Sequence, residues 1–494
     1  MSAADVIVVG SGNAGLCAAL AARQAGARVL LLERGPVDWL GGNSYFTAGA
    51  IRTPHGGLRE LVTLLDDPAD PLLASTDLDP YGEADFLADM RRTTLGRCDP
   101  ELTRTLIADI GPTLRWMCEA GVRFRLMHER QAYEVNGRWR FWGGLALGTV
   151  DGGKGLVTQL HAAARDAGVA VRFDSTVDRL LLDDDGQVCG VACGDRLHQA
   201  RAVVLASGGF EADPLLRARF LGPNWDLAKV RGTPHNTGAA LQAALAINAQ
   251  PAGHWSGCHA VAWDAHAPAH GDRDLTNRYT KQSYPMGIVV NVDGQRFLDE
   301  GADMRNYTYA RYGAEILRQP GALAFQLFDA KTAPLLGELE YEAPGVSRYQ
   351  GATIEELAVA AGLPPERLRE TVDTFNASVG EGHFDPTIKD GMATRGVTPP
   401  KSNWAQRLDE PPYLAFAVTC GITFTFGGLR IDADGRVLAA GGAPIPGLYA
   451  AGETVGGLFY YNYPGGTGLA AGAVFGRRAG RHAAAQRSVG AVTR

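Results

Sequence analysis

The sequence predicts an α/β protein in which an inserted α+β domain interrupts a Rossmann-like domain. An apolar strand over residues 5–9 runs into a glycine-rich turn, and a second apolar strand follows at 28–32. Another strand, glycine-rich turn and helix come after residue 447. The stretch between has a different texture, with dense Tyr and Arg residues at 296–312. We therefore expect a first domain part at 1–250, an inserted domain at 251–405 and a C-terminal part of the first domain at 406–494.

The first glycine-rich turn is Gly10-x-Gly12-x-x-Gly15, and a helix is predicted from about Gly15 to Gln24. Strand, turn, helix and second strand together form the pattern of a dinucleotide-binding site. Gly10 allows the tight turn, Gly12 lets the backbone approach a pyrophosphate, and Gly15 lets the helix pack on the strand. The helix N-terminus presents N–H groups and a positive dipole end to phosphates.

The second strand ends on Glu33, where a carboxylate can accept hydrogen bonds from ribose hydroxyls. This pattern leaves both NAD and FAD open as the ligand. The predicted contacts of this region are Gly10, Gly12, Asn13, Ala14, Gly15, Glu33 and Arg34.

Composition indicates an ordinary globular protein, with 46% apolar and 20% charged residues among 494. A net charge of −7 gives no reason to expect nucleic acid or an anionic membrane as partner. No apolar run reaches the roughly 18 residues of a membrane span, and the first strand starts too early to leave room for a signal peptide. Seven scattered cysteines favour a reducing compartment, so we expect a cytoplasmic protein. Cys189 and Cys193 lack further ligand residues, and no metal site is expected.

Other elements follow from hydrophobic spacing and from Pro and Gly punctuation. Helices are predicted at 81–94, 100–110, 112–120, 154–167, 239–249, from 353, from 364 and from 467 to about 486. Strands are predicted at 169–173, 202–210, 413–419 and 429–431, with a hairpin that joins 180–182 to 188–192.

The segment 447–453 ends in Gly452-Glu453 and resembles the second cofactor motif of two-dinucleotide-binding-domain flavoproteins. In such proteins the Gly-Glu pair meets the ribityl chain, and the next helix N-terminus faces the pyrimidine edge, where its dipole favours negative charge on reduced flavin. The resemblance implies FAD. No His lies in the loop at 42–45, so the FAD is expected to be non-covalent. The remaining predicted cofactor contacts are Gly42, Asn43, Ser44, Thr47, Ala48, Gly49, Val177, Ala206, Ser207, Gly208, Gly452, Glu453, Gly468 and Leu469.

Four motifs, at 41–44, 206–210, 296–300 and 426–429, resemble the flavoprotein family of fumarate reductases, succinate dehydrogenases and 3-ketosteroid Δ1-dehydrogenases. The stretches 254–261, 299–309 and 457–466 resemble the tricarballylate dehydrogenase branch of that family most. This implies an enzyme that removes, or adds, two hydrogens across a C–C bond next to a carboxylate or ketone. One hydrogen moves as a hydride to or from flavin N5, and the other moves as a proton through a positioned acid or base.

The resemblance also implies roles for single residues. Arg305 matches the proton-donating Arg of fumarate reductases, although it lies one residue further from Glu300 than in that family. Tyr307 and Tyr309 are the alternative proton carriers. The residues expected to orient the substrate oxygens are His259, Thr425, Tyr463 and, as a further carboxylate contact, Arg52.

Two departures from fumarate reductases bear on the substrate. Phe424 and Tyr463 replace a His and an Arg that bind carboxylates there, so fumarate and succinate are not expected. A tricarballylate-like carboxylate is the first expectation, and a cyclic ketone of the ketosteroid or cyclohexanone kind is the alternative. A non-catalytic flavin-binding redox subunit is the third possibility. No cysteine pattern suggests an iron–sulfur cluster, so the electron acceptor is expected to be O₂, a quinone or a separate protein.

Overall fold

The computed structural model describes residues 4–486. One half of the molecule is built on a six-stranded sheet. Its strand order is β19 (Arg436–Leu438), β20 (Pro444–Ala450), β12 (Ala202–Leu205), β1 (Val6–Val9), β2 (Val29–Leu32) and β8 (Ala170–Arg172). All its neighbours pair in parallel except β19 with β20. All four residues of β1 are buried, as expected for a parallel strand covered on both faces. This sheet confirms the predicted Rossmann-like fold class.

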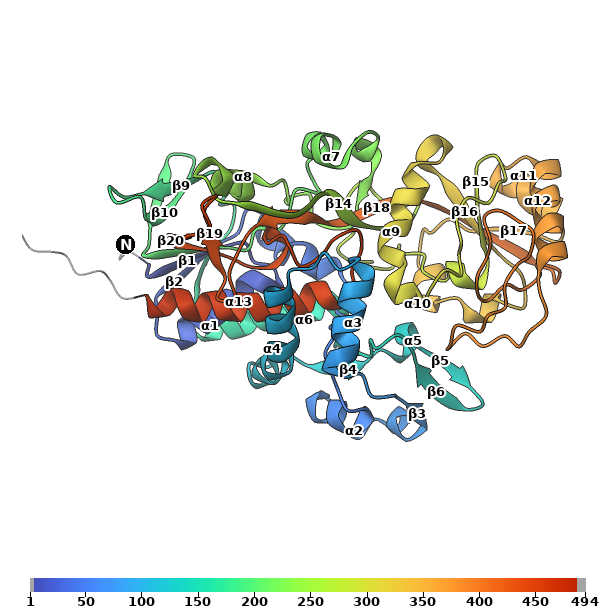
Figure 1. Ribbon diagram of the computed structural model, residues 1–494, viewed down its shortest axis with the longest axis horizontal. Helices are drawn as coiled ribbons and strands as arrows, with labels where there is room; N and C mark the ends of the chain where they lie inside the picture. The colour runs from blue at the N-terminus through green and yellow to red at the C-terminus, as the bar shows by residue number, and fades with distance from the viewer. Residues whose placement is uncertain (1–3, 487–494) are drawn as a thin grey trace, which may run out of the picture.

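The helices α1 (Asn13–Gln24) and α13 (Thr467–Ala485) lie side by side along this sheet (Figure 1). Their close approach depends on glycine. A Cβ on Gly476 would lie 2.3 Å from the carbonyl oxygen of Ala14, and one on Gly480 would lie 2.1 Å from that of Ala18. The packing of α1 against α13 therefore brings the turn before α1 close to the turn before α13.

A second six-stranded sheet is built around β18 (Tyr413–Leu429), which pairs antiparallel with β14 (Pro251–Asp264) along most of its length. The other strands are β13 (Lys229–Val230), β15 (Ile288–Asn291), β16 (Ala324–Phe328) and β17 (Tyr349–Gly351). In Figure 1, β14 and β18 lead from the nucleotide-binding half towards the half that holds β15 to β17. Because β13 lies before residue 250 and β18 lies after residue 405, this sheet joins segments from all three predicted parts. The division into domains stays a prediction.

The remaining elements complete the two halves. The helices are α2 (Leu58–Leu61), α3 (Glu83–Thr93), α4 (Pro100–Glu119), α5 (His128–Gln131), α6 (Gly152–Asp166), α7 (Pro214–Leu221), α8 (Ala239–Ala246), α9 (Tyr309–Leu317), α10 (Glu338–Tyr341), α11 (Ile354–Ala361) and α12 (Pro365–Ser378). The strands are β3 (Thr76–Asp77), β4 (Phe124–Leu126), β5 (Ala132–Val135), β6 (Arg138–Phe141), β7 (Leu147–Thr149), β9 (Arg179–Leu182), β10 (Val188–Cys193) and β11 (Arg196–Gln199). None of the helices within residues 4–486 is both long and apolar enough to cross a membrane.

Two predicted breaks in secondary structure are wrong. Pro112 does not divide a helix, because α4 continues through it for 20 residues. A proline inside a helix costs one backbone hydrogen bond and about 3 kcal/mol, but α4 buries an apolar stripe that includes Leu106, Ile110, Leu114 and Met117. Burial of four such side chains outweighs that cost, since each contributes about 1.5–3 kcal/mol.

The strands predicted at 413–419 and 429–431 are also not separate, because β18 is continuous to Leu429. Glycines between the two predicted strands lie at places of close contact. A Cβ on Gly421 would lie 2.6 Å from the Trp263 Cβ, and one on Gly428 would lie 2.5 Å from the carbonyl oxygen of Thr454. These glycines keep the strand in the sheet where a neighbour approaches it.

Candidate active site

One cavity runs from the α1 N-terminus to the second sheet. Segments that are far apart in sequence line it. Its nucleotide end is lined by Gly10, Gly12, Asn13, Ala14, Glu33 and Arg34, as predicted from the glycine motif. Gly15 lies outside the lining, and a Cβ there would stand 1.9 Å from the carbonyl oxygen of Gly10. Gly15 therefore serves the packing of helix against turn.

Glu33 is buried and held rigidly at this end. Its Oε2 accepts hydrogen bonds from the Ser11 N–H (2.9 Å) and hydroxyl (2.5 Å), and its Oε1 accepts one from the Gly35 N–H (2.7 Å). Each carboxylate oxygen can accept two hydrogen bonds, so Oε1 keeps capacity for a ribose hydroxyl. The first backbone hydrogen bond of α1 runs from the Leu16 N–H to the Gly12 carbonyl. The N–H groups before it are the usual anion-binding groups of a helix N-terminus.

The middle of the cavity is lined by Gly42, Asn43, Ser44, Thr47, Ala48, Val177, Ala206, Ser207 and Gly208. The Ser44 hydroxyl accepts a hydrogen bond from the Asn13 N–H (3.1 Å), which ties this loop to α1. Gly49 does not reach the cavity, because its backbone packs against Thr149 and Gly152. Of the predicted cofactor contacts, Gly15 and Gly49 alone lie behind the lining.

The far wall comes from Gly452, Glu453, Gly468 and Leu469, which also line the cavity. The Asn13 side-chain amide donates to the Leu469 carbonyl (2.8 Å), so the N-terminal motif and the α13 N-terminus are joined directly. Both helices point N-termini into one cavity, and Glu33 is in place for a ribose. These donors and this acceptor fit FAD.

Two buried carboxyl groups meet beside this wall. The Glu453 and Glu211 side chains lie near each other, and burial disfavours two neighbouring carboxylate charges, so the pair holds one proton. Burial, together with the neighbouring Glu211 carboxylate, raises the pKa of Glu453 well above its ordinary value. Glu211 accepts from the Asn43 and Asn236 amides, at 2.6 and 2.7 Å, and Glu453 accepts from the Thr425 N–H at 2.7 Å. Burial raises the pKa of Glu211 as well, but the Arg217 charge acts to lower it, so Glu211 is the better-stabilised anion. Glu453 therefore carries the shared proton.

An aromatic cluster closes the cavity at the second sheet. The Tyr309 and Tyr463 hydroxyls lie 2.5 Å apart, and the His259 ring packs edge-on against both rings, with centroids 5.0 and 5.1 Å away. Neither ring nitrogen of His259 has a hydrogen-bond partner within the described residues. Burial and the nearby Arg231 charge lower the pKa of His259 well below its ordinary value, so the ring is neutral. Tyr309, Tyr463, His259 and Thr425 all line the cavity, which brings four predicted substrate-site residues together.

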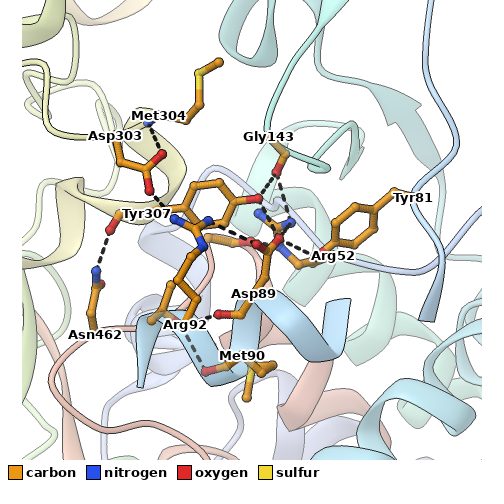
Figure 2. A network of polar contacts seen from close by, with 12 residues as sticks. Arg52, Tyr81, Asp89, Met90, Arg92, Gly143, Asp303, Met304, Tyr307 and Asn462 are labelled. Atoms are coloured by element: carbon orange, nitrogen blue, oxygen red, sulfur yellow. Dashed lines mark hydrogen bonds and ion pairs between the residues drawn. The ribbon is translucent and has the colours of Figure 1, made fainter. Parts of the chain in front are cut away.

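Three other predicted site residues lie outside the cavity lining: Arg305, Tyr307 and Arg52. Figure 2 shows two of them in one polar network, where the Tyr307 hydroxyl donates to Asp89 Oδ2 (2.6 Å) and the Gly143 carbonyl (2.8 Å). Arg52 is fully buried in the same network, 3.5 Å from Asp89, and donates to the Gly465 carbonyl. Both residues thus donate hydrogen bonds to backbone carbonyls and lie outside the cavity lining.

Arg305 also lies outside the cavity lining. Its guanidinium lies over the Trp142 ring, 4.8 Å from the centroid. Residues 305–307 form one turn of 3₁₀ helix, and in this turn Asn306 is the residue that reaches the cavity. Arg305 is offset by one residue from the family pattern, and Asn306 lines the cavity in its place.

Several lining residues were missed by sequence reasoning. They are polar side chains from scattered segments: Arg130, Gln131, Arg231, Asn277, Gln282 and Asn306. Arg231 follows β13, and its Nε and Nη1 donate to Asn277 Oδ1 (3.0 Å) and Thr423 Oγ1 (2.9 Å). No local pattern marks Arg231 in the sequence, since its neighbours Asn277 and Thr423 are 46 and 192 residues away.

Comparison with known proteins agrees with this geometry. The family model described as "FAD binding domain" matches residues 5–469. This chain belongs to that family. A probable fumarate reductase of Shewanella frigidimarina is 29% identical over 492 residues, which cover 97% of this chain and 74% of the relative. A 4-oxocyclohexanecarboxylate 2-dehydrogenase of Sinomonas cyclohexanicum is 31% identical over 556 residues, with 98% and 93% covered.

A crystal structure of the same family supports the fold. The 3-ketosteroid-Δ4-(5α)-dehydrogenase of Rhodococcus jostii RHA1, solved with 4-androstene-3,17-dione, superposes with a TM-score of 0.70 at 26% identity and covers 98% of this chain and 97% of its own. The predicted resemblance and the predicted FAD are thus confirmed. The flavoprotein is an FAD-dependent oxidoreductase that acts on CH–CH or C=C bonds.

Proposed function

We propose that this flavoprotein interconverts a C–C single and double bond next to a carboxylate or ketone, with a tricarballylate-like carboxylate as the first-choice substrate. The observation that carries the proposal is the hydroxyl pair of half-buried Tyr309 and buried Tyr463 beside the neutral His259. Bound FAD supplies the two-electron hydride chemistry. The protein must then hold the activating oxygen atoms and move one proton at the neighbouring carbon.

Tyr309 is suited to the proton transfer. Burial raises the pKa of its hydroxyl, so the phenol is protonated at neutral pH and can donate to a substrate carbon. The Tyr463 hydrogen bond and the Arg231 charge act in the opposite direction and lower the pKa of Tyr309. They would stabilise a phenolate, which the reverse reaction requires. Tyr463 and His259 would hold the oxygen of the activating group.

A ketone substrate is the second candidate. Phe424 and Phe459 pack around Tyr463, with ring centroids 5.2 and 5.3 Å away, and make one side of this end apolar. An uncharged cyclic ketone would fit such a wall. The electron acceptor, whether O₂, a quinone or a separate protein, is part of the proposal in either case. The cytoplasmic location also stays a prediction, which rests on the seven free cysteines.

An anaerobic substrate screen tests the proposal. The purified holoprotein is mixed with tricarballylate, other di- and tricarboxylates, cyclohexanone-type ketones and ketosteroids, and the flavin absorbance is followed. Bleaching by carboxylates and not by ketones supports the first choice, and the converse supports the second. A flavin that is reduced by dithionite but by none of these compounds, and whose reduced form none of the corresponding unsaturated compounds reoxidises, would indicate a non-catalytic flavin-binding subunit.

A further inference from the structure

Arg231 is a buried cation without a counter-ion among residues 4–486. Its side chain is 6% exposed and lines the cavity. Its donors reach the neutral Asn277 side-chain oxygen and the neutral Thr423 hydroxyl. Within residues 4–486, no carboxylate lies within ion-pair distance of Arg231. A buried charge is costly unless it is paired, so an anion is expected to enter with a ligand.

The other buried cations of the described chain differ from Arg231. Lys281 lies 3.4 Å from Asp264, Arg296 lies 2.5 Å from Glu300, and Arg52 lies 3.5 Å from Asp89. Lys401 has no carboxylate partner within residues 4–486, but its ammonium donates to the Gly287 carbonyl and it does not line the cavity. Arg217 has no carboxylate partner, but it donates to four backbone carbonyls and does not line the cavity. Arg231 alone among these faces the cavity with its charge uncompensated.

Further donors without acceptors surround the same part of the cavity. Asn277 Nδ2, Asn306 Nδ2 and both His259 ring nitrogens have no hydrogen-bond partner in the described chain, and all three side chains are at least 95% buried. They line the cavity together with Arg231. Buried donors are normally satisfied, and one anionic group with several lone pairs would accept from the two amides and from the single N–H of the neutral His259 ring.

Arg130 lines the same wall of the cavity and adds less net positive charge than Arg231. It lies 2.6 Å from Glu340, so most of its charge is compensated inside the protein. Arg130 and Arg231 nevertheless act on each other electrostatically. Arg231 therefore has no ion-pair partner among the described residues, whereas the charge of Arg130 is mostly compensated by Glu340.

We propose that Arg231, with the Asn277 amide, binds a carboxylate of the substrate and so selects carboxylates over uncharged ketones. This inference rests on the proposed function and decides between its two candidates. The fork of a guanidinium suits bidentate binding of a carboxylate. Asn277 holds the fork in place through its oxygen and presents its amide N–H₂ to the same ligand.

Asn277→Asp is the sharpest test. It keeps the shape of the side chain, gives Arg231 an internal counter-ion and removes the free amide donor. The Asn277→Asp holoprotein should fold and retain FAD, yet bind carboxylates on the order of 10²-fold more weakly, as when a partner of a buried charge pair is lost. Arg231→Gln should weaken binding at least as much, and Arg231→Lys should weaken it less because it keeps the charge. Arg219→Gln removes one charge from an exposed position and serves as the control.

Binding is measured from the change in the absorbance spectrum of oxidised holoprotein on addition of malonate, tricarballylate or cyclohexanone, with no turnover required. Tight carboxylate binding by wild type that both cavity variants lose supports the inference. Absence of carboxylate binding by wild type would overturn it, as would unchanged carboxylate affinity in Asn277→Asp and Arg231→Gln. A more negative flavin potential in Arg231→Gln with unchanged carboxylate affinity would assign the charge to the reduced flavin instead. Carboxylate binding that depends on Arg231 without any flavin bleaching would refute the proposed reaction and leave the binding site standing.

Discussion

The hydroxyl of Tyr309 lies 2.5 Å from the hydroxyl of Tyr463, although the two residues are 154 positions apart in the chain. Tyr309 opens α9 in the half built on the second sheet, and Tyr463 lies in the loop that leads into α13. The pair therefore connects the wall that carries the substrate groups to the helix that faces the cofactor. The proposed proton carrier, Tyr309, therefore lies where the two halves meet.

Tyr309→Phe tests this role. It removes the hydroxyl from the cavity and keeps the packing of the ring. We expect kcat to fall about 10²–10⁴-fold, the usual contribution of a positioned acid or base, while FAD stays bound. Steady-state kinetics with a substrate found by the anaerobic screen measure the loss. Turnover at the wild-type level would assign the proton transfer to another group.

Tyr307→Phe is the matched comparison for that experiment. The Tyr307 hydroxyl donates to half-buried Asp89 and to the Gly143 carbonyl and does not reach the cavity. Its loss should lower the free energy of unfolding by about 1–3 kcal/mol, because half-buried acceptors lose a donor. Turnover per folded, FAD-loaded molecule should change much less than in Tyr309→Phe. Denaturant unfolding and kinetics on the same preparation separate the two effects, and the reverse ranking of kcat would contradict the placement of Tyr307.

Arg305→Lys distinguishes the family pattern from the observed geometry. If Arg305 were the acid or base, turnover would fall by orders of magnitude. Because its guanidinium lies over Trp142 and outside the cavity, we expect kcat to change by less than about tenfold. A loss comparable with that of Tyr309→Phe would show that Arg305 reaches the substrate in the working enzyme.

Sequence reasoning found the residues whose roles depend on local backbone geometry. Gly10, Gly12 and Glu33 act through a turn and a strand end, which a short motif encodes. Arg231 and Asn277 were missed because their relation arises only when β13 and the segment after β14 meet in the folded chain. The helix break predicted at Pro112 was wrong for the opposite reason. Proline normally ends a helix, but burial of the apolar face of α4 outweighs that local preference.

Glu453→Gln tests the shared proton of the buried carboxyl pair. The raised pKa of Glu453 means that the folded state keeps a proton that the unfolded state loses above about pH 4.5. Wild-type stability from this group is therefore greatest below that pH and declines as pH rises, by at most about 1.4 kcal/mol per pH unit. Glutamine is neutral throughout, so the variant should gain stability relative to wild type between pH 5 and 8. Thermal unfolding of both holoproteins across this range measures the difference, and a constant difference would argue against a protonated Glu453.

The attachment of FAD gives a simple check. The cavity loop at 42–49 contains no His or Cys that could form a covalent flavin bond. Acid precipitation should release all the flavin into the supernatant and leave a denatured chain with the mass of the polypeptide alone. Yellow precipitate, or a chain that is heavier by one FAD, would refute the prediction of non-covalent binding.

The most direct measurement of the central claim is the rate of flavin reduction in a single anaerobic turnover, compared between wild type and Tyr309→Phe. The holoprotein is mixed rapidly with tricarballylate and with related carboxylates, and the flavin absorbance is recorded. Fast bleaching in wild type that slows about 10²-fold or more in Tyr309→Phe is the result that the Tyr309–Tyr463 geometry predicts. Equal bleaching rates in the two proteins, or a flavin that no carboxylate and no ketone bleaches, would contradict it.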